Sequence, residues 1–208
     1  MQFSRRELID FAVAWVALSV AFTLLLTGVP RGGSAAPGQT VLGPLAAALL
    51  GPPMAISLVG VGVAFVLHEL AHKVVAVRFG QIAEFRASYE MLLLAVLSAL
   101  AGFLVAAPGA VHHRGRLTAR QRGLIALSGP VTNLLLVAPF WALALTDGLV
   151  GRIGIVGVFA NAVLAAFNLV PYGPLDGATV RAWDARVHAV ALAGTGALAA
   201  AVLFGLIP

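Results

Sequence analysis

The chain has 208 residues, of which 61% are hydrophobic and only 10% charged, and it contains no cysteine. Soluble globular domains carry about 25% charged residues, so this chain has too few charges to cover a water-facing surface of its own size. Disordered chains are polar and charge-rich, so disorder is excluded as well. Without cysteine there can be no disulfide, no thiolate metal site and no cysteine nucleophile. The composition predicts an integral membrane protein of one compact domain, residues 1–208, with no soluble appended domain.

The basic residues outnumber the acidic ones, which gives a formal net charge of +5. Their distribution nevertheless does not indicate nucleic-acid binding. They are scattered among apolar segments, whereas nucleic-acid-binding domains gather them on one face. Arginines clustered beside a membrane span are the usual sign of its cytoplasmic end. We therefore expect the lipid bilayer, and no nucleic acid, as a partner. The one local cluster consists of Arg114, Arg116, Arg120 and Arg122.

Taken in chain order, the apolar segments predict an all-α polytopic membrane protein with five to six transmembrane helices. A full span needs about 20 apolar residues. Segment 41–50 is apolar but too short, and the Gly-Pro-Pro sequence that follows it favours a half-helix or a re-entrant piece. Segment 91–107 is either a sixth span or a second re-entrant piece. The full spans are expected at residues 8–29, 54–79, 123–145, 153–170 and 187–207.

Two short segments favour extended structure. Residues 83–88 alternate apolar and polar side chains, the period-2 pattern of a strand. Residues 109–114, which begin the hydrophilic connection before the third full span, are the other candidate strand. A short β-hairpin is therefore expected beside the helices.

Residues 68–72 read His-Glu-Leu-Ala-His, an HExxH motif inside the second expected span. Residues four apart lie on one face of a helix, so His68 and His72 can bind one Zn²⁺ while Glu69 reaches a water at the metal. Ionisable side chains are costly in a bilayer interior and are rarely kept there without a function. The motif therefore predicts a zinc site. The alternative interpretation is a polar helix end whose histidines are satisfied by hydrogen bonds.

A catalytic zinc needs three protein ligands and one open position, and the third ligand must come from the few acidic residues of the chain. One of them, Asp176, lies within residues 168–177, where prolines and glycines break a helix. Broken helices at membrane depth occur where the backbone is buried in protein or lines a wet cavity. A carboxylate on such a break is well placed to turn toward a metal. The other candidates are Glu84, Glu90, Asp147 and Asp184.

Three motifs together resemble the site-2 protease family of intramembrane zinc metalloproteases. They are His-Glu-Leu-Ala-His at 68–72, Ser-Gly-Pro-Val-Thr-Asn at 128–133, and Asn-Leu-Val-Pro-Tyr-Gly-Pro-Leu-Asp-Gly at 168–177. An HExxH sequence alone is a weak signal, but the three in this order, each in an apolar helix, are highly specific. They define a core of about residues 54–180.

The resemblance implies the following roles. His68, His72 and Asp176 would be the ligands of one Zn²⁺ per chain, and Glu69 would be the general base. Asn133 and Asn168 would position the substrate or stabilise the oxyanion, although hydrogen bonding between helices explains them equally well. The implied activity is hydrolysis of peptide bonds in or near the transmembrane helix of a membrane-protein substrate, as in regulated intramembrane proteolysis.

The distribution of basic residues favours a re-entrant segment 91–107. If this segment crossed the membrane and the N-terminus were inside, the Arg114–Arg122 cluster would face outside, against the positive-inside rule. If the segment instead enters the membrane and returns to the same side, Arg5, Arg6 and that cluster all lie on the cytoplasmic side. Both metal-binding segments then end near the cytoplasm. The Arg-rich, Lys-poor composition is typical of GC-rich prokaryotic genomes, so we expect a prokaryotic cell membrane.

Two other functions are open at this point. A catalytically silent relative could bind membrane substrates without cutting them, but the intact Glu69 argues against this. A zinc or small-solute transporter would need acidic residues and histidines distributed along a path through several helices, whereas here they are concentrated at one site. The sequence does not indicate an oligomeric state.

Overall fold

The computed structural model describes residues 1–28, 42–105 and 107–207. Within them the chain is mostly helical, and five helices are long and apolar enough to cross a membrane, as the sequence predicted. The second span is a continuous run of α3 (Pro52–Ser57), the π-helical turn η1 (Leu58–Gly62) and α4 (Val63–Arg78). The other spans are α1 (Arg5–Thr27), α6 (Ala119–Ala144), α7 (Gly148–Asn168) and α9 (Ala185–Leu203).

The third span begins earlier than hydropathy suggested. α6 starts at Ala119 rather than at residue 123 because Thr118 forms a capping box with Gln121: the Thr118 hydroxyl accepts from the Gln121 amide, and the Gln121 side chain accepts from the Thr118 amide. This arrangement satisfies backbone donors that a helix start leaves free. The first turn of the span is therefore polar and carries two arginines, Arg120 and Arg122.

The turn η1 brings the second span into close contact with its neighbours. A Cβ at Gly62 would lie 2.0 Å from the Trp15 ring, and one at Gly60 would lie 3.1 Å from the Gly157 amide nitrogen. Trp15 Nε1 donates to the Leu58 carbonyl at 2.8 Å. π-helical turns often occur at functional sites, and this one lies in the same span as the HExxH motif.

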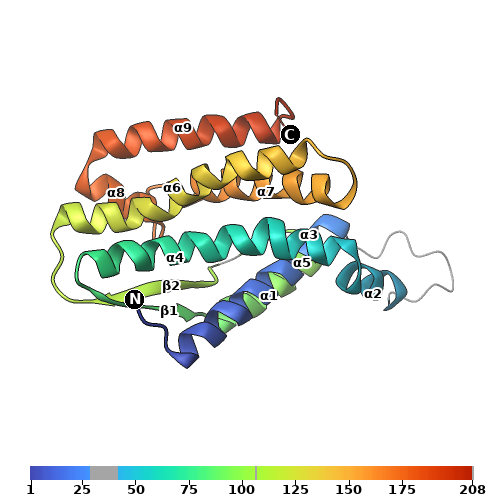
Figure 1. Cartoon of the computed structure of the whole chain (residues 1–208), viewed down its shortest axis with the longest axis horizontal. Helices are drawn as coiled ribbons and strands as arrows, with labels where there is room; N and C mark the ends of the chain where they lie inside the picture. Colours follow the sequence, from blue (N-terminus) through green and yellow to red (C-terminus); the bar gives the residue numbers. More distant parts are fainter. Residues whose placement is uncertain (29–41, 106, 208) are drawn as a thin grey trace.

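The expected hairpin is present. β1 (Ile82–Ala87) pairs antiparallel with β2 (Gly109–Arg114), in a register that runs from Ile82 opposite Arg114 to Ala87 opposite Gly109. Between the strands, α5 (Tyr89–Leu100) has 12 residues, a length of about 18 Å. That helix is too short to cross a bilayer, and the chain returns to the sheet end that it left. α5 packs along α1 (Figure 1), as the re-entrant interpretation predicted.

The other partial segment is also helical. α2 (Leu42–Leu50) has nine residues and is followed by a break at Gly51. Its expected first residue, Val41, lies outside the described residues. Among the described residues, five full spans, the partial segments α2 and α5, a further short helix before α9 and a hairpin make up the architecture, which matches the expected fold class.

A buried ion pair joins α1 to the HExxH helix and to the hairpin. Glu7 Oε2 accepts from Lys73 Nζ, and Glu7 Oε1 accepts from the Phe85 amide at 2.9 Å. Each of these side chains is at most 1% exposed. Lys73 Nζ also donates to the Gln2 carbonyl at 2.9 Å and lies over the Phe3 ring. One carboxylate thus connects α1, α4 and β1.

The elements that carry the sequence motifs meet at one end of the molecule. Figure 1 shows the end of α4, the start of α6, the short helix α8 (Asp176–Trp183) and the start of α9 gathered there, with the hairpin beside them. α6 runs between α4 and α7, so it contacts both motif-bearing spans.

Candidate metal centre

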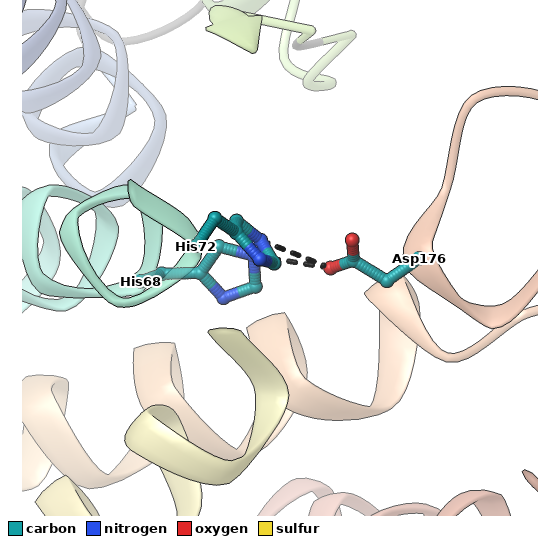
Figure 2. Close-up of side chains that lie close together, drawn as sticks. All are labelled: His68, His72 and Asp176. Carbon is teal, nitrogen blue, oxygen red and sulfur yellow. Dashed lines mark ion pairs between the residues drawn. The ribbon is translucent and has the colours of Figure 1, made fainter. Parts of the chain in front are cut away.

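Three side chains from two helices converge at this end. His68 and His72 lie one turn apart on α4, and Asp176 is the first residue of α8. Figure 2 shows both imidazoles turned toward the Asp176 carboxylate. The His68 Nε2 to Asp176 Oδ2 distance is 3.3 Å, and the His72 Nε2 to Asp176 Oδ2 distance is 3.4 Å. Among the described residues, these form a group whose ligand atoms all lie within 4.8 Å of one another.

The separations fit tetrahedral zinc. Zn–N and Zn–O bonds of about 2.0–2.2 Å place two ligand atoms of a tetrahedral site about 3.3–3.5 Å apart. The two Nε2 to Oδ2 distances, 3.3 and 3.4 Å, match this separation. Asp176 Oδ2 is buried and has no hydrogen-bond partner among the described residues. A buried carboxylate oxygen without a partner is costly, and a cation held between the imidazoles would satisfy it.

Hydrogen bonds fix the tautomer of each histidine. His72 Nδ1 lies 2.8 Å from the Ile125 carbonyl, which can only accept, so Nδ1 carries the proton. His68 Nδ1 lies 2.5 Å from Asn133 Oδ1, which also only accepts. In the neutral form of each imidazole, Nε2 therefore presents a lone pair toward Asp176. Metal-binding histidines usually donate their second ring nitrogen to such a partner, which orients the ring and raises its basicity.

Asn133 is held by a network of its own. Its amide Nδ2 donates to the Ala64 carbonyl at 3.1 Å and to Asn161 Oδ1 at 2.8 Å. Asn161 in turn donates to the Gly157 carbonyl at 2.8 Å. Because both Nδ2 contacts are acceptors, the orientation of the Asn133 amide is determined and its oxygen must face His68. Asn133 and Asn161 are both fully buried, and the structure places Asn133 directly behind His68.

Gly129 lets α6 approach the histidines. A Cβ at this position would lie 2.6 Å from ring atoms of both His68 and His72. Any larger residue would push the imidazoles apart or displace the helix. A second glycine, Gly177, follows the acidic ligand, and a Cβ there would lie 2.1 Å from the Leu169 carbonyl oxygen. Close packing therefore brings α6 against α4 at Gly129 and the start of α8 against the end of α7 at Gly177.

Glu69 is buried beside the ligands. It is 9% exposed, follows His68 on α4, and interacts electrostatically with His72, His68 and Asp176. The Glu69 carboxylate therefore lies close enough to His68, His72 and Asp176 to interact with them electrostatically, and in HExxH zinc sites the glutamate at this position acts as a general base.

Asn168 and the other candidate acids have different surroundings. Asn168 Nδ2 donates to the Leu164 carbonyl of its own helix at 3.0 Å. Glu84 accepts from Ser4 and Arg86, and the Ser4 hydroxyl lowers the pKa of that carboxyl. Asp184 caps α9 by accepting from the Arg186 and Val187 amides, and neither Glu90 nor Asp147 belongs to the group of ligand atoms.

Two features of the site could not be found by motif reading. The acceptor for His72 is the backbone carbonyl of Ile125, which has no side-chain signature. Asn161 looks from the sequence like an isolated polar residue in the apolar helix α7, and only the packing of α6 on α7 reveals its contact with Asn133. An uncompensated amide inside a span is nevertheless a signal, because polar groups in membranes usually have partners.

The chain is similar to two curated proteins. It is 36% identical over 194 residues to "Putative zinc metalloprotease MJ0611" of Methanocaldococcus jannaschii. The matched region covers 91% of this chain and 90% of that protein. It is also 36% identical over 170 residues to "Putative zinc metalloprotease Rip3" of Mycobacterium tuberculosis, covering 75% of this chain but only 39% of Rip3. No protein-family model matches the chain. No solved structure matches it either.

Proposed function

The chain belongs to the site-2 protease family of zinc metalloproteases, and from this membership we propose that it is an intramembrane endopeptidase. It is a membrane protease that depends on zinc, and its proposed substrates are membrane proteins cut in or near a transmembrane helix. The observation that carries the proposal is the arrangement of His68, His72 and Asp176 at tetrahedral separations within helices long enough to span a bilayer.

The proposed roles follow from the positions of the side chains. His68 Nε2, His72 Nε2 and Asp176 Oδ2 would hold the ion, and Asn133 and the Ile125 carbonyl orient the two imidazoles. A zinc ion at this place supplies Lewis-acid polarisation of a carbonyl and makes water more acidic. Glu69 takes a proton from the attacking water and returns it to the leaving amine. Asn168 donates one amide N–H to the Leu164 carbonyl, which leaves its second N–H and its Oδ1 for the proposed contact with the substrate.

The proposed location is a prokaryotic cell membrane, with the zinc site toward the cytoplasm. The end of the molecule that contains the site also contains Arg78 at the end of α4, Arg120 at the start of α6 and Arg181 on α8 (Figure 1). The start of α7, at the other end, has Arg152. Proteins that follow the positive-inside rule have such an excess of arginine at the cytoplasmic end of their spans. The two curated relatives come from an archaeon and a bacterium.

The test is a Glu69→Gln substitution in the full-length protein. Glutamine keeps the size and polarity of the side chain but cannot accept the proton, so we expect the variant to retain zinc and to lose cleavage by at least about 100-fold. Membrane fractions of cells that make the active protein and of cells that make the variant are compared by proteomics. Fragments of membrane proteins should appear only with the active protein. The same fragments at the same level with the Glu69→Gln variant would refute the proposed mechanism.

A further inference from the structure

The end of the molecule that contains the metal centre has an unneutralised positive surface. The arginines that form it are exposed, and none of their guanidinium groups makes an ion pair or hydrogen bond with a described residue. They lie on β2, on the connection to α6, in the first turn of α6, on α8 and at the start of α9. We call this group the arginine surface; it comprises Arg114, Arg116, Arg120, Arg122, Arg181 and Arg186.

The acidic residues near this end are already engaged elsewhere. Glu7 pairs with Lys73, and Glu84 accepts from Ser4 and from Arg86. Asp184, which lies between two residues of the arginine surface in the sequence, uses its carboxylate to cap α9. Among the described residues no acidic side chain forms an ion pair with the arginine surface, so the surface keeps a net positive charge that an external anion can neutralise.

A cavity lies within this surface, between the first turn of α6 and one face of α8. Its volume is about 380 Å³, and its lining includes Arg122, Thr179 and Trp183. The Trp183 indole packs against Gly123, where a Cβ would lie 2.2 Å from the ring. Thr179 is exposed, and its hydroxyl has no hydrogen-bond partner within the residues that the structure describes, so it is accessible to a ligand in the cavity. The cavity thus combines an unpaired guanidinium, an unpaired hydroxyl and an indole.

We propose that this cavity binds the phosphate group of an anionic phospholipid, with Arg122 and Thr179 as its polar contacts. Arginine binds phosphate oxygens through paired N–H groups. Tryptophan is enriched where headgroups meet the hydrocarbon core, and basic pockets between helices at a cytoplasmic end bind acidic headgroups. The remaining residues of the arginine surface face the same anionic leaflet. The inference needs the membrane setting but not the proposed proteolysis.

The cavity is lined by the helix that carries Asp176, so a lipid bound there can affect the metal centre through that helix. Four lining residues, Ala178, Thr179, Ala182 and Trp183, belong to α8. The same eight-residue helix begins with Asp176. A headgroup bound between α8 and α6 therefore restrains the helix that carries the acidic ligand, and we expect anionic lipid to hold Asp176 in place.

The experiment measures lipid retention by native mass spectrometry on the full-length, zinc-loaded Glu69→Gln protein. That background makes the result independent of proteolysis, because the variant is expected not to cleave. The probes are dioleoylphosphatidylglycerol, dioleoylphosphatidylcholine and inorganic phosphate. We expect phosphatidylglycerol to be retained in preference to phosphatidylcholine, and inorganic phosphate not to displace it.

Arg122→Gln should weaken phosphatidylglycerol retention roughly fivefold, the equivalent of about 1 kcal/mol for one arginine at a membrane surface. Thr179→Val, which keeps the volume and removes the hydroxyl, should also weaken it. The matched control is Arg152→Gln, since Arg152 is exposed and lines another cavity, one formed with residues at the opposite end of the bundle. Retention that falls equally in Arg122→Gln and Arg152→Gln, or equal retention of both lipids, would overturn the proposal. Displacement by inorganic phosphate would overturn the assignment to a lipid.

Discussion

The contact of Asn133 with the candidate metal centre is made by its side-chain oxygen, Oδ1. Its Oδ1 accepts from His68 Nδ1 at 2.5 Å, and its Nδ2 is held by two acceptors, so the amide cannot turn over without losing two hydrogen bonds. The His68 tautomer is thereby fixed with a free lone pair on Nε2. From the sequence, Asn133 could either support the substrate or pack helices; these contacts lead us to propose that it positions His68 for metal binding.

We predict that Asn133→Ala lowers zinc affinity by about 10- to 100-fold, the usual cost of losing an outer partner of a metal-binding histidine. The matched control is Asn168→Ala, because Asn168 donates only to the carbonyl of Leu164 in its own helix. Zinc affinity is measured by competition with a chelator in detergent. Equal affinities in the two variants would contradict the positioning role, and thermal unfolding of both proteins excludes misfolding as the cause.

Motif spacing was sufficient to propose the ligands but not their supports. His68, His72 and Asp176 could be proposed because the HExxH spacing places two imidazoles on one helix face and because the broken helix at 168–177 resembles a family motif. The Ile125 carbonyl could not be proposed, since every residue has such a carbonyl and only the packing of α6 on α4 selects this one. The same holds for Asn161.

At the scale of elements, the ion pair of Glu7 and Lys73 connects three parts of the fold. Replacing one partner of a buried pair leaves an uncompensated charge. We predict that Glu7→Gln, which keeps an acceptor for the Phe85 amide, destabilises the protein by about 3 kcal/mol. The free energy of unfolding is measured by denaturation in detergent.

The control is the double variant Glu7→Gln with Lys73→Met, which removes the buried cation as well. Much of the cost of breaking a buried ion pair comes from the charge left without a partner, so the double variant, which has no such charge at this place, should regain much of the lost stability. A double variant less stable than Glu7→Gln alone would show that Lys73 stabilises the fold through its contacts with the Gln2 carbonyl and the Phe3 ring instead.

The observed bounds of the strands and helices show which of them could be predicted from sequence patterns. Alternation predicted the first strand to within one residue, since β1 spans Ile82–Ala87 and the expected range was 83–88, and β2 spans the expected residues 109–114. The start of α6 was placed too late because hydropathy alone ignores polar first turns, although Thr118 and Gln121 form a recognisable capping box. The register of the hairpin could not be predicted, because it depends on the path of α5 between the strands.

At the scale of the whole molecule, the fold determines on which side of the membrane each connecting segment lies. The pairing of Ala87 with Gly109 means that the chain enters and leaves the α5 segment at the same place. An odd number of full spans then separates the two termini, and the arginine surface lies on the side of residue Arg5. Five spans follow from hydropathy and length, while the return of α5 follows from the hairpin.

Single-cysteine labelling tests this topology directly, because the natural chain has no cysteine. We predict that Arg5→Cys and Arg116→Cys react with a membrane-impermeant maleimide only from the cytoplasmic side, and that Thr146→Cys reacts only from the other side. All of these positions are exposed. If Arg116→Cys were labelled together with Thr146→Cys, α5 and its flanking residues would have to cross the membrane.

The central claim is that α4 and α8 together hold one zinc ion. The most direct measurement is the zinc content of purified Asp176→Ala protein beside that of Glu90→Ala, an exposed acid in the first turn of α5 that follows the HExxH motif more closely in the sequence. The structure predicts that Asp176→Ala loses its zinc while Glu90→Ala keeps a single ion per chain. Zinc retained by Asp176→Ala and lost from Glu90→Ala would contradict it.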